Sequence, residues 1–235
     1  MFSYGLWGYE TVLTVILSVV ALIVVLWAQT NINTTYGKYK KRNTSKGLSG
    51  QEVARQILDA NGLQDIYVVE VKGDLSDHYD PSRKVVRLSR DIFHGTTIAA
   101  VSVAAHECGH AIQDKEGYTF MKIRSFLVPI VNIVSYLGYF GLIVSIFAGI
   151  TGYIKLSILV LLATLLFQLV TLPVEFDASK RAGEQLEKLG LVEPSEKNHC
   201  MKMLKAAALT YVASLASTLL NLLRLVLMLA SRSDD

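Results

Sequence analysis

Two histidines stand four residues apart in the segment AVSVAAHECGHAIQD, residues 100–114, with a glutamate directly after the first. Residues four apart share one face of an α-helix, so His106 and His110 can offer two imidazole nitrogens to a single zinc ion. Glu107 then projects beside them toward a metal-bound water, which is the HExxH arrangement. Zinc lowers the pKa of such a water toward about 7, and Glu107 is the candidate base that accepts its proton.

The alternative is a packing helix whose histidines bond to carbonyl groups, because a short motif of this kind also occurs by chance. The surroundings of the motif favour a metal. The segment carries small or apolar residues at Ala99, Ala100, Val103, Ala104 and Ile112. Such a helix is expected to be buried, and burying two histidines and a glutamate costs free energy unless a partner compensates for it. A Zn²⁺ ion would be that partner.

A third ligand is expected in LPVEFDASKRAGEQLEKLG, residues 172–190. Glu175 stands two residues after Pro173, where an apolar stretch ends, and is expected to begin a new helical stretch. One alternative is an ordinary first-turn glutamate that the helix dipole stabilises. Another is that Asp177 is the ligand instead. We favour Glu175, because HExxH followed by a distal glutamate is the commoner zinc pattern.

The composition favours a membrane protein. Of the 235 residues 51% are hydrophobic and 18% charged, and the mean hydropathy is +0.38, which is unusual for a soluble domain. The net charge of +3 reflects basic residues beside apolar segments, a pattern typical of a membrane surface rather than of a nucleic-acid interface. Cys108 and Cys200 are too few for a disulfide framework, and we expect Cys108 to be buried and inert.

Four apolar stretches are long enough to cross a bilayer, which needs about 20 residues. They cover residues 6–27, 126–149, 154–173 and 206–230. The second and third are joined by a very short loop and should form a helical hairpin. The fourth contains Asn221 and Arg224, so an in-plane or bundle-buried helix is the alternative to the spanning one that we favour.

Lysines and arginines in the flanks predict the orientation. They concentrate in YGKYKKR, residues 36–42, directly after the first span, and in the polar helical segment 174–205. The positive-inside rule places both segments in the cytoplasm of a multi-pass cell-membrane protein. Because the chain leaves by the second span and returns by the third, Glu175 comes back to the side of His106 and His110.

The polar portion between the first two spans, residues 28–125, is expected to form a small cytoplasmic α+β unit. Residues 47–63 have the pattern of a helix with Ser49 as its N-cap. Residues 65–71 are typical of a strand, and residues 75–89 of a hairpin. The segment KVVRLS within that hairpin is a candidate edge to which an extended substrate adds its backbone, or simply a half-buried strand.

Four motifs stand out together: LSDHYDPSRKVVRLS, AAHECGHAIQ, LPVEFDASKRA and AAALTYVA. On them, the chain resembles the bacterial neutral zinc metallopeptidases of the YugP-like membrane family over essentially its whole length. It is also similar to HtpX-type membrane peptidases, in which a transmembrane hairpin separates HExxH from a glutamate ligand. The resemblance implies a gluzincin-like site, with His106, His110 and Glu175 holding one Zn²⁺ ion and Glu107 as general base.

Two features of the implied site are open. Many gluzincins carry an aspartate four residues after the ligand glutamate, and it orients the first histidine; this chain has Ser179 there. Either Asp177 takes that role, or Asp177 is itself the ligand. Peptide hydrolysis also needs a donor to the oxyanion. His199 and Arg181 are chemically able, as are Tyr211 and His78, which lie in the quoted motifs but can equally be structural.

We therefore expect a mainly α polytopic membrane protein with a small zincin-like catalytic portion. The expected function is a zinc-dependent metalloendopeptidase that cleaves membrane or membrane-proximal proteins in exposed loops or tails. The alternative is a non-catalytic membrane scaffold or quality-control protein with a structural metal. A structural zinc usually has four protein ligands, so three candidates plus a free position favour catalysis. The expected partners are a peptide substrate and the lipid bilayer, with no nucleic acid, and the oligomeric state is left open.

Overall fold

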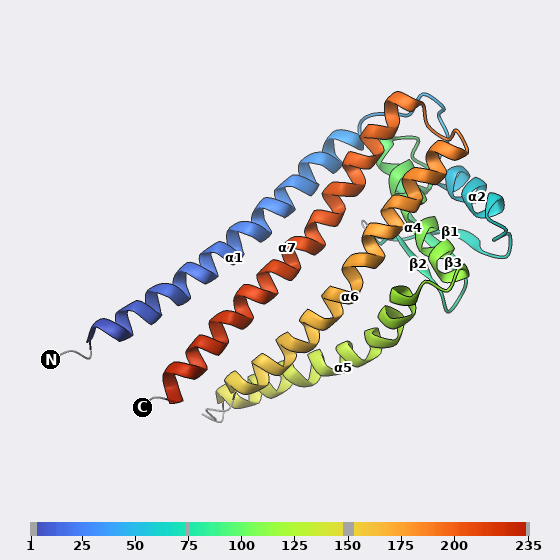
Figure 1. The fold of residues 1–235 in the computed structure, drawn as a ribbon. Coiled ribbons are helices and arrows are strands. Elements are labelled where there is room, and N and C mark those ends of the chain that lie inside the picture. The colour runs from blue at the N-terminus through green and yellow to red at the C-terminus, as the bar shows by residue number, and fades with distance from the viewer. Residues whose placement is uncertain (1–3, 74–75, 148–152, 234–235) are drawn as a thin grey trace. The chain divides into compact units, whose positions relative to one another are not determined.

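The computed structural model describes residues 4–73, 76–147 and 153–233. Within them the chain forms long helices, short helices and one small sheet (Figure 1). The elements are α1 (Tyr4–Tyr39), α2 (Gly50–Ala60), β1 (Tyr67–Val71), β2 (His78–Asp80), β3 (Val85–Ser89), α3 (Arg90–Phe93), α4 (Ile98–Lys115), α5 (Thr119–Phe147), α6 (Tyr153–Lys188) and α7 (Pro194–Ser233).

The elements divide into two compact units. The described parts of residues 1–29, 123–171 and 210–235 form one, which we call the membrane unit. Residues 30–122 and 172–209, as far as described, form the other, which we call the site unit.

The long helices are apolar enough to cross a bilayer. Among the described residues, the qualifying stretches are Val12–Tyr39, Thr119–Gly141, Ile154–Lys188 and Pro194–Ala230. Their most apolar windows leave most side chains unburied by protein, as expected for helices that face lipid tails. These stretches and the small sheet confirm the expected fold class, a polytopic and mainly helical membrane protein with a small α+β portion.

Helices α5 and α6 pack closely within the membrane unit. A Cβ atom added to Gly141 would lie 2.7 Å from Leu156 Cδ2, and one added to Gly138 would overlap Val160. Glycine therefore lets these two helices approach, as small residues commonly do in membranes. The contact agrees with the predicted helical hairpin, although positions 148 and 149 of the predicted second span lie outside the described residues.

The polar groups of the fourth apolar stretch are used inside the membrane unit. Arg224 Nη1 donates to Ser18 Oγ of α1 at 3.0 Å, and Asn221 Nδ2 donates to Ser217 Oγ at 3.5 Å. The first bond joins two helices and the second lies within α7, and such bonds make a polar residue tolerable in an apolar environment. This stretch is part of α7, which is long enough to span.

Helix α6 does not break at Pro173, so the expectation that Glu175 begins a new helical stretch is wrong. A proline removes only one backbone donor, and the hydrogen bonds on both sides of it keep the helix intact. The predicted segment 174–205 consists of the end of α6, a turn, and the start of α7. Glu175 therefore sits in the interior of a helix, where its direction is set by the helix face.

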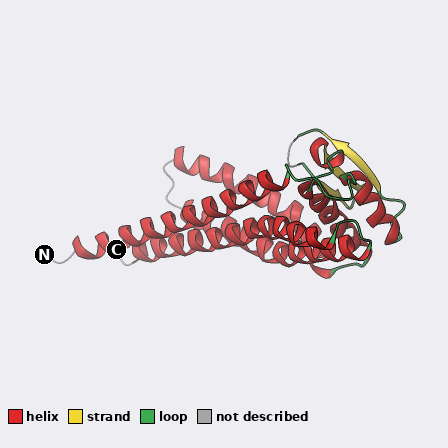
Figure 2. Ribbon diagram, turned by 90° about the horizontal axis from the view of Figure 1, so that it is seen from above, coloured by secondary structure: helices red, strands yellow, loops and turns green. Residues whose placement is uncertain are grey.

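The sheet of the site unit has the order β1-β3-β2, with β1 parallel and β2 antiparallel to β3. The predicted strand in residues 65–71 and the predicted hairpin are therefore confirmed, although position 75 of the hairpin prediction lies outside the described residues. Figure 2 shows the strands beside short helices of this unit. The expectation that KVVRLS is an edge strand is wrong, because β3 pairs with a strand on both sides. Strand β2 lies at an edge of the sheet, so one of its sides is unpaired, and it contacts α4, the helix that carries HExxH.

Helices α2 and α4 pack against each other in the core of the site unit, to which the sheet, α6 and α7 also contribute. Ser49 and Glu52 make a reciprocal capping box at the start of α2, as the sequence predicts for Ser49. Ile57 of α2 is fully buried, and Cys108 of α4 donates from Sγ to the carbonyl of Ala54. Burial raises the pKa of the Cys108 thiol, which agrees with the expected inert role.

Candidate metal centre

Helix α4 presents two histidines side by side. Thr97 caps its first turn by accepting a hydrogen bond from Ala100 N at 3.2 Å, and Gly117 follows its end with a φ of +67°. The rings of His106 and His110 meet edge to face with their centroids 4.7 Å apart. The predicted helical spacing therefore brings both imidazoles to one point.

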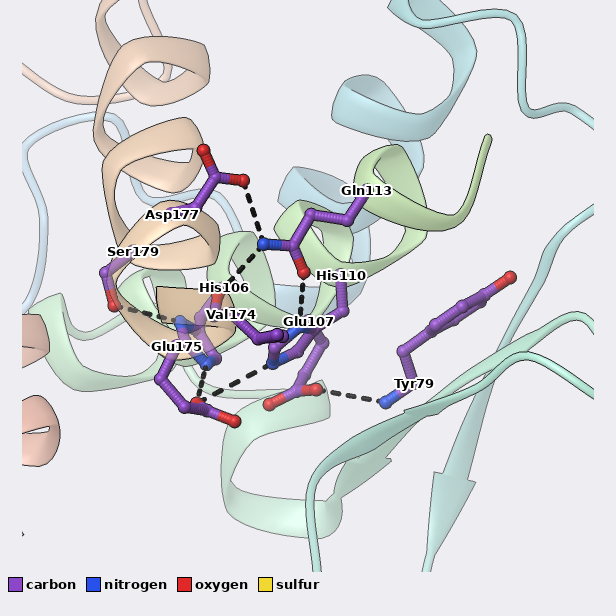
Figure 3. A network of polar contacts seen from close by, with 9 residues as sticks. All are labelled: Tyr79, His106, Glu107, His110, Gln113, Val174, Glu175, Asp177 and Ser179. Atoms are coloured by element: carbon purple, nitrogen blue, oxygen red, sulfur yellow. Dashed lines mark hydrogen bonds and ion pairs between the residues drawn. The ribbon is translucent and has the colours of Figure 1, made fainter. Parts of the chain in front are cut away.

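Glu175 of α6 completes a cluster with them. Its Oε2 lies 3.2 Å from His106 Nε2 and 3.8 Å from His110 Nε2 (Figure 3). One ligand atom of each residue lies within 4.8 Å of the other two. Glu175 is 2% exposed, so its carboxylate depends on the imidazoles for compensation. Two imidazole nitrogens and one carboxylate oxygen are a donor set of catalytic zinc, and these residues fit that ion.

A close contact between α4 and α6 brings Glu175 to the histidines. A Cβ atom added to Gly109 would lie 2.5 Å from the backbone oxygen of Ala178 and 3.1 Å from its Cα. Val174 and Ala178, on the facing side of α6, are fully buried. Only glycine at position 109 lets the two backbones approach this far, because every other residue carries a Cβ.

Replacing Gly109 by alanine is therefore expected to weaken zinc binding by at least roughly tenfold and to destabilise the fold by about 1–3 kcal/mol, the usual range for overpacking. The obstacle is backbone, so the helices must separate and carry Glu175 away. Zinc affinity by competition with a chelator, and the thermal unfolding midpoint, measure the effect. Gly37→Ala is the matched control, because that helical position has no neighbouring atom within 4 Å. Unchanged zinc affinity in Gly109→Ala would contradict the argument.

Ser179 contacts the first histidine. Its Oγ lies 3.2 Å from His106 Nδ1, while Nε2 of the same ring faces Glu175. When Nε2 acts as a ligand, Nδ1 carries the proton and donates it to Ser179. The expectation that Asp177 orients His106 in place of the missing aspartate is therefore wrong. Position 179 is one helical turn after Glu175, so its side chain lies on the same face of α6, and the serine hydroxyl reaches the ring.

Gln113 contacts the second histidine, and sequence reasoning missed it. Its Oε1 lies 3.0 Å from His110 Nδ1. Its Nε2 donates to the carbonyl of Val174 at 2.9 Å and to Asp177 Oδ2 at 2.8 Å. Gln113 is fully buried, so these bonds fix its amide and the tautomer of His110. A signal was present in the sequence, because Gln113 is an amide three residues after His110 and therefore lies on the same side of the helix.

Asp177 lies outside the cluster of ligand atoms. It accepts from Gln113, and it also accepts from Arg181 Nε at 2.5 Å. Arg181 in turn donates from Nη1 to Oε2 of Glu116 at 2.6 Å. The structure therefore brings Glu175, and not Asp177, to the two imidazoles.

Glu107 is held by strand β2. Its Oε2 accepts from the backbone N–H of Tyr79 at 3.0 Å (Figure 3). The same tyrosine donates from its hydroxyl to Asp114 of α4 at 2.8 Å, so β2 is joined to α4 at two points. Burial raises the pKa of the Glu107 carboxyl to about 7. A carboxylate with this pKa can both accept and return a proton near neutral pH.

Two of the candidate oxyanion donors, Arg181 and His199, are engaged by other side chains. Arg181 is engaged by Asp177 and Glu116, as described above. His199 Nε2 lies 3.2 Å from Arg42 Nη1, and its ring meets the Tyr39 ring at a tilt of 55°, with the centroids 5.6 Å apart. These contacts place His199 in a separate cluster.

The role of oxyanion donor stays a prediction for His78 and for Tyr211. His78 is an exposed residue of β2, and its Nδ1 lies 2.7 Å from the carbonyl of Ser76. It directly precedes Tyr79, whose N–H reaches Glu107. Tyr211 is a partly exposed residue in the membrane-unit portion of α7.

Comparisons with known proteins agree with this chemistry. A protein-family profile described as "Putative neutral zinc metallopeptidase" matches residues 14–230. The chain is 42% identical over 223 residues to a protein of Bacillus subtilis (strain 168) named "Putative membrane protease YugP". That alignment covers 95% of this chain and 99% of the relative. No solved structure matches the chain.

Proposed function

Since this chain belongs to the neutral zinc metallopeptidase family, as its motifs predict, we propose that it is a membrane-bound, zinc-dependent endopeptidase. The observation that carries the proposal is the meeting of His106, His110 and Glu175, whose ligand atoms lie within 4.8 Å of one another. Two of them come from the HExxH helix and the third from a helix more than sixty positions later. Such a convergence of buried donors is hard to explain by packing alone.

The proposed site holds one Zn²⁺ ion through the Nε2 atoms of both histidines and a carboxylate oxygen of Glu175. Ser179 and Gln113 support this assignment, because they occupy the two Nδ1 atoms and leave the Nε2 lone pairs for the metal. When bound, zinc supplies a Lewis acid that polarises the scissile carbonyl and makes water acidic. Three protein ligands favour this catalytic proposal over a scaffold with a structural metal, which usually has four.

Glu107 is the proposed general base. The Tyr79 N–H holds its carboxylate in place, next to the histidines in sequence. In the proposed reaction Glu107 accepts the proton of the attacking water and then returns it to the leaving amine. Burial raises the pKa of this carboxyl above its ordinary value, which favours its holding the proton between the two transfers.

The proposed substrates are membrane or membrane-proximal proteins, cleaved on the cytoplasmic side. The Bacillus relative, named as a putative membrane protease, supports this proposal. The orientation rests on the positive-inside rule, because basic residues follow the first span in residues 36–42 and recur after Glu175 at Lys180, Arg181 and Lys188.

Removing the metal tests the proposal. Chelation of the purified full-length protein is expected to take its zinc content from near one ion per chain to near zero and to abolish cleavage of a membrane-proximal peptide. Adding Zn²⁺ back is expected to restore both. Metal analysis and a peptide-cleavage assay on the same samples measure the two effects. Zinc loss without any change in cleavage would contradict a catalytic metal, and a chain that never binds zinc would contradict the site.

A further inference from the structure

Helices α1 and α7 line an open cavity of about 320 Å³ within the site unit, which we call the basic cavity. Helix α1 contributes Asn31, Thr35 and Lys38, and helix α7 contributes Lys202 and Lys205. None of these residues contacts the metal cluster in any interaction described above. The basic cavity is therefore a feature that the proposed function does not use.

The spacing of these residues explains why they meet. Positions 31, 35 and 38 are related by four and then three residues, so their side chains lie on one face of α1. Positions 202, 205, 206 and 209 share one face of α7 in the same way. Two basic segments near opposite ends of the chain, each predicted to be cytoplasmic, thus line a single cavity.

The cavity is lined by positive charge without a neutralising carboxylate. Its lining includes Lys38, Lys202 and Lys205 but no acidic residue. In the described part of the chain, no ion pair joins these three lysines to an aspartate or glutamate. Gathering three ammonium groups costs Coulomb energy that a bound anion would offset.

The surroundings of the cavity add to this charge. Lys38, Lys202 and Arg42 all lie close enough to the His199 ring to act on it electrostatically. Glu196, an acid that acts on the same ring, already accepts hydrogen bonds from the backbone and hydroxyl of Ser45. Lys38 Nζ lies over the Tyr39 ring, 5.6 Å from its centre, so its partner there is an aromatic ring and not an anion. The basic cavity therefore has a positive potential and no anionic partner among the residues that line it, which is the chemistry of an anion site.

We propose that the basic cavity binds the phosphate of an anionic phospholipid. Lysine ammonium groups, the Asn31 amide and the Thr35 hydroxyl all donate to phosphate oxygens. The apolar residues Ala206 and Leu209 also line the cavity and suit the glycerol backbone of a lipid better than they suit free phosphate. The cavity lies at the carboxyl end of the apolar stretch Val12–Tyr39, and basic pockets beside spans commonly bind lipid head groups there.

Native mass spectrometry of the full-length protein, titrated with phosphatidylglycerol or phosphatidylcholine, tests the proposal. We expect tight binding of phosphatidylglycerol and an affinity lower by on the order of 10- to 100-fold in the triple variant Lys38→Gln, Lys202→Gln, Lys205→Gln. The charge-conserving triple arginine variant is expected to keep binding. A matched control replaces the exposed residues Lys72, Lys122 and Lys188 by glutamine. It removes the same charge outside the cavity and is expected to bind phosphatidylglycerol like the parent.

Three results would overturn the proposal. Equal loss of affinity in both glutamine variants would mean general attraction to the membrane surface rather than a site. Equal binding of phosphatidylcholine and phosphatidylglycerol would exclude recognition of charge. Displacement of phosphatidylglycerol by millimolar inorganic phosphate would assign the cavity to a soluble anion. Circular dichroism and zinc content of each variant check that the fold is intact. If the glutamine variant misfolds, the binding of the arginine variant and the comparison of the two lipids still test the proposal.

Discussion

The Glu107→Gln variant is expected to lose peptidase turnover by roughly 10²- to 10⁴-fold or more while keeping its zinc, because a positioned general base contributes about that much. Glutamine has the same shape, and its amide oxygen can still accept the Tyr79 N–H. A neutral amide is also easier to bury than a carboxylate, so the fold is not expected to weaken. The turnover number on a membrane-proximal peptide and the zinc content per chain measure the two effects.

Glu70→Gln is the matched control for that experiment. Glu70 is an acidic residue of β1 in the same unit, and its carboxylate lies 2.8 Å from Nε2 of the exposed His94. This variant is expected to cleave at the parental rate. Parental cleavage by Glu107→Gln would remove Glu107 as the base and, with it, the main argument for an enzyme over a metal-binding scaffold.

Glu175→Gln is expected to lose zinc almost completely, whereas Asp177→Asn is expected to weaken zinc binding only about 10- to 100-fold. The two carboxylates differ in whether they contact the histidines directly. Glu175 Oε2 lies against both Nε2 atoms, so its loss removes a ligand. Asp177 reaches His110 only through Gln113, so its loss loosens a supporting hydrogen bond. Zinc affinity by competition with a chromogenic chelator separates the two ranges.

The order of these two effects decides between the two candidate carboxylates. A larger loss of zinc in Asp177→Asn than in Glu175→Gln would make Asp177 the ligand. Glu184→Gln, on the exposed face of the same helix and paired there with Lys180, is the control for removing a charge from α6. It is expected to bind zinc like the parent.

Much of the fold and part of the site could be predicted from local patterns. Long apolar runs predict spans because the bilayer requires a certain length of apolar helix, whatever surrounds it. The four-residue spacing of His106 and His110 predicts a shared face because helix geometry is local. Ser49 and the strands were predictable for the same reason. Counting the predicted spans also placed Glu175 on the same side of the membrane as the histidines, which made it a candidate third ligand.

The sequence by itself thus determined the chemistry that is available: two imidazoles, a base, a distal carboxylate and a membrane to hold them. Only the tertiary structure decided which side chains support those groups. The approach of α4 to α6 at Gly109 brings Ser179 into contact with His106. Gln113 contacts His110, and Asp177 accepts a hydrogen bond from the Gln113 amide instead of reaching the histidines. Likewise, β2 rather than β3 has the unpaired side because strand order depends on which strands meet in space. Such contacts join residues far apart in the chain, and no local periodicity encodes them.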